Sequence, residues 1–330
     1  MKIERVRSRA VAAPMKRPLP TSIATLNEAG LLLIDLQTDQ GVVGRAYLFG
    51  LGKHNLPTIA KLVETMADMV QGDAVAPFDL EKKLRAKYAL LGVHNMVLFA
   101  IAGIDMAAWD ALGQALGQPL ARLLGGIPRP VAAYNSNGLG IRSPKELEKE
   151  ALELVEEGFR AVKLRLGRAH AKDDLDALRA VKRAIGPEIT LMVDFNQALS
   201  VAEALERGRM IDEEGGVYWI EEPIRADDFA GNARLARELR TPIQIGENFM
   251  GPEQMAQALA AGVEMSSHLF PEASCHLLAV TPTCHWLEFV DWAAPVLQEP
   301  LIVRDGFVVA PERPGLGMAW NEEAVRRYLL

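Results

Sequence analysis

The sequence predicts an α/β fold: a modified (β/α) TIM-like barrel with an N-terminal α+β capping domain. Apolar runs that each end in an acid recur at 189–195, 217–223 and 242–248, and such near-continuous runs are typical of strands buried on both faces. The acids stand at 194, 221 and 247, so they are 27 and 26 residues apart, which fits one strand, one helix and two loops. Alternating segments followed by helical periodicity precede these runs and indicate an α+β unit.

Composition describes an ordinary globular protein. The chain has 330 residues, 49% hydrophobic and 24% charged, and its net charge of −7 argues against nucleic-acid binding, which needs clustered Lys and Arg. Its two cysteines, Cys275 and Cys284, indicate neither a disulfide framework nor a zinc site. No signal peptide and no apolar run of about 18 residues is found. We therefore expect a cytoplasmic protein without nucleic-acid or membrane partners.

The first predicted domain covers residues 1–128. We expect a strand at 3–13 ended by Pro14, then a turn-rich stretch, and a hairpin of strands 31–38 and 42–49. Three helical segments follow between about 55 and 125. The loop 16–29 carries Leu19, Ile23 and Leu26, which either pack against their own domain or form an apolar lid that excludes water from a reacting centre.

The second predicted domain covers residues 129–330. A short strand at 131–134 opens it, and helices and strands then alternate. Helices are expected at 143–157, 171–185, 200–214, 228–239 and 251–261, and strands at 160–166, 189–195, 217–222 and 242–247.

The three strand-end acids are Asp194, Glu221 and Glu247. The carboxyl ends of barrel strands meet at one face, where barrel enzymes carry their chemistry. So much negative charge requires a cation, and oxygen ligands favour Mg²⁺, with Mn²⁺ as a substitute. A single strand-end acid more commonly caps the next helix, but three in register favour the metal site.

Further polar residues surround this predicted site. Lys163 and Arg165 lie two apart on a strand and so face the barrel interior together, either flanking the metal or pairing with Asp194. His268 follows a short strand-like run and could act as an acid or base. Glu288 could donate a proton if burial raises its pKa. Together these groups suit abstraction of a proton next to a carboxylate.

Several motifs resemble the enolase superfamily, mandelate racemase subgroup. AAWDALGQALGQPLARLLGG (107–126) resembles the signature at the end of the capping domain, and AVKLRLG, VDFNQ, WIEEP and GENFMGPEQM follow in family order. SSHLFPE and HWLEFVD are similar to mandelate racemase itself.

The resemblance implies a role for each matching residue. Asp194, Glu221 and Glu247 match Mg²⁺ ligands, and Asn196 a polar group near the substrate hydroxyl. His268 matches the catalytic base, Glu288 an acid that hydrogen-bonds the substrate carboxylate, and Lys163 the first lysine of a Lys-x-Lys motif. Leu19, Ile23 and Leu26 match the apolar capping loop.

Two features depart from the family pattern. Arg165 replaces the second lysine of the motif, and a guanidinium is a poor base, so two-base racemisation is in doubt. Only 21 residues separate positions 247 and 268, so about one βα unit is absent near 261–264, including the acid that orients the histidine. Either the natural protein has a segment that this sequence lacks, which we favour, or the unit is deleted.

These observations predict a Mg²⁺-dependent enzyme that abstracts the α-proton of a 2-hydroxy carboxylate, as a mandelate-racemase-like racemase or epimerase. A sugar-acid dehydratase is the alternative that Arg165 favours, and a metal-binding but catalytically silent protein is a third. We expect a small-molecule carboxylate as substrate and a homo-oligomer as the assembly.

Overall fold

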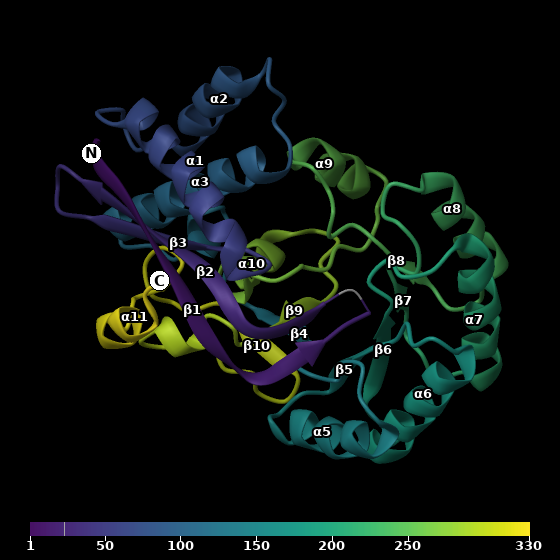
Figure 1. Ribbon diagram of the computed structural model, residues 1–330. Coiled ribbons are helices and arrows are strands. Elements are labelled where there is room, and N and C mark those ends of the chain that lie inside the picture. Colours follow the sequence, from purple (N-terminus) through teal and green to yellow (C-terminus); the bar gives the residue numbers. More distant parts are fainter. Residues whose placement is uncertain (23) are drawn as a thin grey trace.

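The protein consists of a cap and an incomplete barrel (Figure 1). The structure, a computed structural model, describes residues 1–22 and 24–330. In the cap, β1 (Ile3–Pro20), β2 (Thr25–Thr38) and β3 (Val43–Phe49) form an antiparallel sheet in that order. The expected hairpin of the second and third strands is confirmed by pairing from Leu31–Phe49 to Gln37–Val43. The predicted lid residue Ile23 lies outside the described residues.

The first hairpin is longer than the sequence predicted. β1 continues past Pro14 to Pro20 and pairs with β2 as far as Pro20–Thr25. Proline lacks a backbone N–H, but β1 is an edge strand and its register shifts between Pro14 and Leu19, so the prolines interrupt little of the ladder. The expected loop is therefore an arm that extends from the cap toward the barrel.

The tip of this arm is hydrogen-bonded to the barrel. The hydroxyl of Ser22 donates to the carbonyl oxygen of Phe195 at 3.1 Å. The backbone N–H of Ile141 donates to the oxygen of Pro20 at 2.7 Å. The arm is therefore fixed at the ends of the barrel strands.

Helices cover one face of the cap sheet. They are α1 (Leu56–Val70), α2 (Pro77–Tyr88) and α3 (Asn95–Leu116), preceded by the 3₁₀ turn η1 (Lys53–Asn55) and followed by α4 (Leu120–Leu123). Ile34, Leu48, Val63 and Ile104 belong to their shared core. By length and composition α3 could cross a membrane, but half of its apolar window is buried within the protein, as in the core helix of a globular domain.

The barrel strands are parallel and lie in sequence order. They are β4 (Pro130–Asn135), β5 (Ala161–Arg165), β6 (Thr190–Asp194), β7 (Ile220–Glu221) and β8 (Ile243–Gln244). On the other side, β9 (Leu287–Phe289) pairs with β4 in parallel, and β10 (Phe307–Val309) pairs with it antiparallel. The intervening and C-terminal helical elements are α5 (Pro144–Glu156), α6 (Ala171–Ile185), α7 (Val201–Glu214), α8 (Phe229–Glu238), α9 (Pro252–Ala260), α10 (Pro271–Val280), η2 (Ala294–Val296) and α11 (Glu322–Tyr328). The predicted α/β barrel with an antiparallel cap is thus confirmed.

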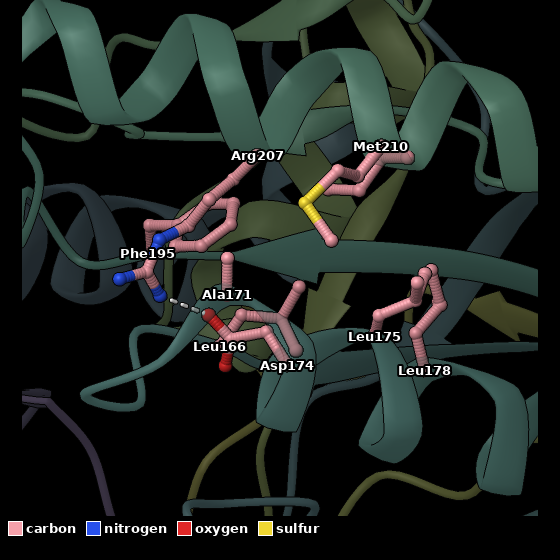
Figure 2. Close-up of a pocket in the computed structure, with 9 residues that line it drawn as sticks. Leu166, Ala171, Asp174, Leu175, Leu178, Phe195, Arg207 and Met210 are labelled. Atoms are coloured by element: carbon pink, nitrogen blue, oxygen red, sulfur yellow. Dashed lines mark hydrogen bonds and ion pairs between the residues drawn. The ribbon is translucent and has the colours of Figure 1, made fainter.

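Successive side chains of β5 point to opposite faces of the strand, as expected. Val162 and Leu164 point outward into a fully buried core with the helices, whereas Lys163 and Arg165 point inward. Behind these strands lies a small cavity between α6 and α7 (Figure 2). Asp174 and Arg207, which form a buried ion pair, are among the residues that line it. This cavity lies outside the barrel and contains none of the predicted site residues.

The barrel wall is open on one side. Among the described residues, β8 pairs only with β7, and the segment 265–267 pairs only with 283–286, through a bridge of Met265 to Cys284. The chain connects α9 to this segment directly, since Gly262 N–H donates to Leu259 O and Val263 N–H to Ala258 O. None of the residues of α9 is buried. The structure therefore shows the fold that a direct connection produces, and an additional natural segment stays a prediction.

Candidate active site

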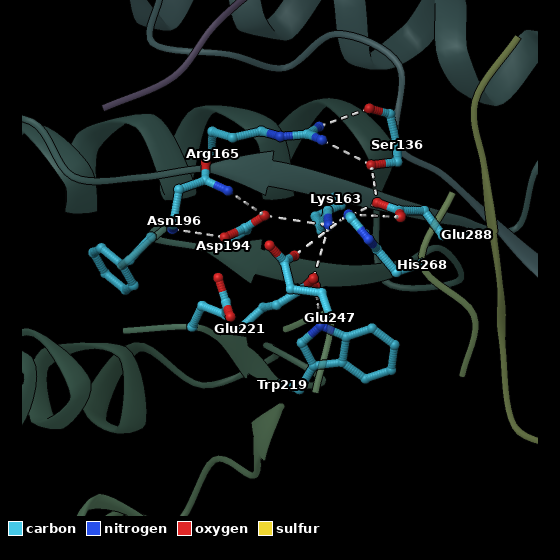
Figure 3. Close-up of polar contacts among 12 residues, drawn as sticks. Ser136, Lys163, Arg165, Asp194, Asn196, Trp219, Glu221, Glu247, His268 and Glu288 are labelled. Atoms are coloured by element: carbon cyan, nitrogen blue, oxygen red, sulfur yellow. Dashed lines mark hydrogen bonds and ion pairs between the residues drawn. The ribbon is translucent and has the colours of Figure 1, made fainter. Parts of the chain in front are cut away.

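Four buried charged residues meet inside the barrel at the strand ends (Figure 3). Lys163 lies on β5, Asp194 ends β6, Glu221 ends β7 and Glu288 lies on β9. Their side chains are 2%, 2%, 7% and 2% exposed. Trp219 donates its indole N–H to Oε2 of Glu221 at 3.2 Å and so helps to orient that carboxylate.

Lys163 is at the centre of this cluster. Its Nζ lies 3.2 Å from Oδ2 of Asp194, 3.0 Å from Oε1 of Glu221 and 2.9 Å from Oε1 of Glu288. Burial would lower the pKa of Lys163, but the attraction of Glu221 and Glu288 outweighs it and holds that pKa well above its ordinary value. Lys163 is therefore an ammonium ion here and not a base.

The three predicted metal ligands do not yet surround one point. Among the described residues, no group of three His, Cys, Asp or Glu side chains is arranged to hold a cation. Lys163 contacts Asp194 and Glu221, while Oε2 of Glu247 lies 3.6 Å from Nε2 of His268. A cation at this place would have to share Asp194 and Glu221 with the ammonium group of Lys163.

The charges of the cluster nevertheless fit a divalent ion. Burial, and then the charges of Glu222, Asp194 and Glu221, raise the pKa of Glu247 to about 10. Burial also raises the pKa of Glu221 to about 7, against the attraction of Lys163. Carboxylates that resist ionisation when packed together are stabilised by a hard cation, and oxygen donors of this kind suit Mg²⁺.

His268 and Glu247 lie on the open side of the barrel. Their side chains are 37% and 22% exposed, in contrast to the buried cluster. Among the described residues no hydrogen bond reaches the imidazole of His268, and Oε2 of Glu288 lies 3.9 Å from its Nε2. The imidazole therefore contacts the edge of the cluster without a fixed partner.

Glu288 is an ionised acceptor in this structure. Burial would raise its pKa, but Lys163, His268 and a hydrogen bond from Ser136 hold that pKa well below its ordinary value. The condition under which Glu288 was expected to donate a proton is thus not met here.

Arg165 is bound to the loop that follows β4. Its guanidinium donates to the backbone oxygens of Ser136 and Gly138 and to the hydroxyl of Ser136. Sequence reasoning missed Ser136. The signal was available, since Ser136 directly follows a strand, as the three acids do.

The remaining predicted residues lie around the mouth. Asn196 has φ of +46° and donates both its backbone N–H and its side-chain amide to Asp194, at 2.7 and 3.1 Å. Leu19 is buried and Leu26 half-buried in a core that also contains Leu269, the residue after His268. The arm thus shares an apolar core with the residue that follows His268.

Sequence comparison finds two related families. Residues 3–125 match the family described as mandelate racemase / muconate lactonizing enzyme, N-terminal domain. Residues 146–263 and 255–324 match the family described as enolase C-terminal domain-like, in two matches that overlap at 255–263. The two segments meet at α9, where the barrel is open.

Individual proteins are similar over most of the chain. The L-talarate/galactarate dehydratase of Salmonella typhimurium is 32% identical over 91% of this chain and 83% of its own. Their alignment spans 336 positions, more than the 330 residues here, so the relative has residues that this chain lacks. Other relatives are cycloisomerases, epimerases and a racemase.

Two solved structures are closely similar. An enolase from alpha proteobacterium BAL199 with bound Mg is 40% identical, with a TM-score of 0.96 and coverage of 100% of this chain and 99% of that one. An enolase from Bradyrhizobium in complex with magnesium and mandelic acid is also 40% identical, with a TM-score of 0.94 and coverage of 100% and 98%.

Proposed function

Because the chain belongs to the mandelate racemase / muconate lactonizing enzyme family of the enolase superfamily, whose members are Mg²⁺-dependent isomerases and dehydratases, we propose that it removes the α-proton of a 2-hydroxy carboxylate with His268 as the base. The substrate is a small carboxylate that enters at the barrel mouth. We further propose a homo-oligomer in the cytoplasm.

One observation carries this proposal: of the candidate bases around the buried acids, His268 alone is free to take a proton. Lys163 is held as an ammonium by Glu221 and Glu288. Arg165 keeps its charge at any physiological pH and donates to three oxygens of the loop after β4. Among the described residues His268 makes no such bond, and its side chain is 37% exposed.

The remaining site residues have distinct roles in the proposed reaction. Asp194, Glu221 and Glu247 would hold Mg²⁺, which when bound supplies a Lewis acid for the charge that develops on the substrate carboxylate. Lys163 adds a fixed positive charge beside that carboxylate. Asn196, positioned by Asp194, is available to the substrate hydroxyl. The apolar arm excludes water from one side.

We rank dehydration of a sugar acid ahead of racemisation. His268 takes the α-proton, the electron pair of the C–H bond forms a C=C bond, and the hydroxyl on the next carbon leaves as water after taking a proton back from His268. The enol product then becomes a 2-keto acid. This sequence needs one base, which agrees with the fixed Arg165, and the L-talarate/galactarate dehydratase relative supports it.

Racemisation is the second candidate. Its support is the apolar arm with Leu19 and the similarity to the Bradyrhizobium enolase in complex with mandelic acid. A catalytically silent metal-binding protein is the third, supported by the exposed His268 without a hydrogen-bonded carboxylate.

Incubation with a set of 2-hydroxy and sugar acids in D₂O with Mg²⁺ separates the three candidates. Dehydration releases a 2-keto acid, detected with semicarbazide. Racemisation gives α-deuterium and a change in optical rotation without a keto acid. Mg²⁺ binding with neither change in any acid would sink the proposed proton abstraction.

A further inference from the structure

Arg165 is a buried cation without an ion pair. Its residue is 4% exposed, and among the described residues no carboxylate lies within 4.0 Å of its guanidinium nitrogens. Instead one terminal nitrogen donates to the oxygens of Ser136 and Gly138 at 2.8 and 3.0 Å, and the other to the hydroxyl of Ser136 at 2.8 Å (Figure 3). Burial of an unpaired charge is costly unless hydrogen bonds compensate it, and these three bonds hold the guanidinium in one place.

The hydrogen bond from Arg165 orients the hydroxyl group of Ser136. A guanidinium can only donate, so the Ser136 oxygen must accept from Arg165. The one proton of that hydroxyl is then free to point to Oε1 of Glu288, 2.7 Å away. Ser136 is completely buried, so water does not compete for the proton.

Glu288 transmits the contact to the base. Its Oε1 accepts from Ser136 and Lys163, and its Oε2 accepts the backbone N–H of Leu269 at 2.9 Å. Leu269 and Phe270 have backbone φ angles of +56° and +48°, values that residues other than glycine rarely adopt. The bond from Leu269 to Glu288 therefore holds a strained turn directly after His268.

We propose that Arg165 is a positioning residue that acts through Ser136 and Glu288 on the Leu269 turn, and so fixes where His268 stands. The inference rests on the proposed role of His268 as base. In this role Arg165 neither removes a proton nor binds the substrate. Arg165 is the first member of a hydrogen-bond relay that leads through Ser136 and Glu288 to Leu269.

Four variants test the relay: Arg165→Lys, Arg165→Met, Ser136→Ala and the double variant Arg165→Met/Ser136→Ala. Arg207→Lys is the matched control, because Arg207 is also buried and donates to backbone oxygens but lies behind the barrel. Two readouts are needed. The first is amide hydrogen exchange at Leu269 in the metal-free protein, by NMR or mass spectrometry. The second is kcat and KM for the acid that the incubation in D₂O identifies as the substrate.

The relay predicts exchange at Leu269 about tenfold faster or more in Arg165→Met and Ser136→Ala, since each removes a charge-assisted bond upstream of Glu288. We expect kcat to fall by about 10- to 100-fold, because the base is misplaced, with KM within about twofold. The double variant should resemble either single variant, since both interrupt one path. Arg165→Lys should restore part of the protection, and Arg207→Lys should change neither readout.

Two results would overturn the inference. Unchanged exchange at Leu269 in Ser136→Ala would show that the relay does not hold the turn; this variant only removes a hydroxyl, so it remains usable if Arg165→Met does not fold. A raised KM with unchanged Leu269 exchange would instead make Arg165 a substrate ligand. Failure of the proposed function is recognised separately, by full activity of His268→Asn.

Discussion

Nζ of Lys163 lies 3.0 Å from Oε1 of Glu221, so a protein cation is already bound to one of the predicted metal ligands. The two residues come from β5 and β7, on either side of β6. The ammonium offsets one charge, while Asp194, Glu221, Glu222, Glu247 and Glu288 lie in or beside the cluster. The remaining excess of negative charge determines how the site responds to pH and to Mg²⁺.

The first prediction concerns Mg²⁺ and pH. The pKa values of Glu221 and Glu247 are raised to about 7 and about 10, so folding without a cation favours their protonated forms. Their contribution to the free energy of unfolding is therefore full at low pH and declines as pH rises above about 4.5, through about 7 for Glu221 and about 10 for Glu247. Mg²⁺ must displace these protons, so its affinity should increase over the same range.

Thermal unfolding at pH 5.5, 7.0 and 8.5, with and without Mg²⁺, measures this effect. At one fixed Mg²⁺ concentration the stabilisation should grow with pH, because Kd falls, and it should reach about 2.7 kcal/mol at the pH where that concentration is 100 times Kd. A stabilisation that is independent of pH would mean that these carboxyl groups do not bind the ion.

The second prediction separates a predicted ligand from its neighbour. Glu221→Gln removes a charged oxygen donor and should weaken Mg²⁺ binding by more than about 100-fold. Glu222→Gln is the control, because Glu222 accepts instead from Gln197 and Asn248, and its loss should have a much smaller effect. Isothermal titration of both variants gives the comparison. Equal losses of Mg²⁺ affinity in the two variants would contradict the assignment of Glu221 as a metal ligand.

The third prediction concerns the base. His268→Asn keeps a polar side chain but cannot take a proton, so α-hydrogen exchange should fall by about 10²- to 10⁴-fold. Mg²⁺ affinity should change little, because His268 is not a predicted ligand. Deuterium incorporation followed by NMR measures the first quantity, and titration measures the second. Exchange at the wild-type rate would exclude His268 as the base.

Much of the fold was predictable because it follows from local rules. The βα period and the inward-facing pair on β5 were read from spacing alone, and the structure confirms both. Ser143 and Ser200 even form complete capping boxes with Glu146 and Glu203 at the starts of α5 and α7. Such signals lie within a few residues of the structure that they determine.

What was not predictable depends on partners far apart in the chain. The extension of β1 past Pro14 depends on pairing with β2 at an edge, which no local signal reveals. The low pKa of Glu288 depends on Lys163, 125 residues away. Likewise the approach of Oε2 of Glu247 to Nε2 of His268, at 3.6 Å, joins residues that are 21 positions apart in the chain. Tertiary contacts, not residue types, decide these features.

The last prediction concerns the contact between cap and barrel. The hydroxyl of Tyr47 on β3 donates to Oε2 of Glu272 on α10 at 2.6 Å, and both residues are buried. Tyr47→Phe leaves this carboxyl group without its side-chain partner and should lower the free energy of unfolding by about 1–3 kcal/mol. Tyr88→Phe, at a half-buried position in the cap, is the matched control and should change it by less than about 0.5 kcal/mol.

The pH dependence of this loss distinguishes the lost hydrogen bond from a packing defect. Burial raises the pKa of Glu272, and the hydrogen bond from Tyr47 opposes that rise. Without the hydroxyl the pKa of Glu272 should rise further, because the ionised form loses more stabilisation from the missing donor than the protonated form does. The destabilisation by Tyr47→Phe, measured by urea unfolding, should therefore be largest at alkaline pH and decrease on acidification, when the carboxyl group takes up a proton. If Tyr47→Phe lowers the free energy of unfolding by the same amount at every pH, the loss comes from packing between cap and barrel and not from the Tyr47–Glu272 hydrogen bond.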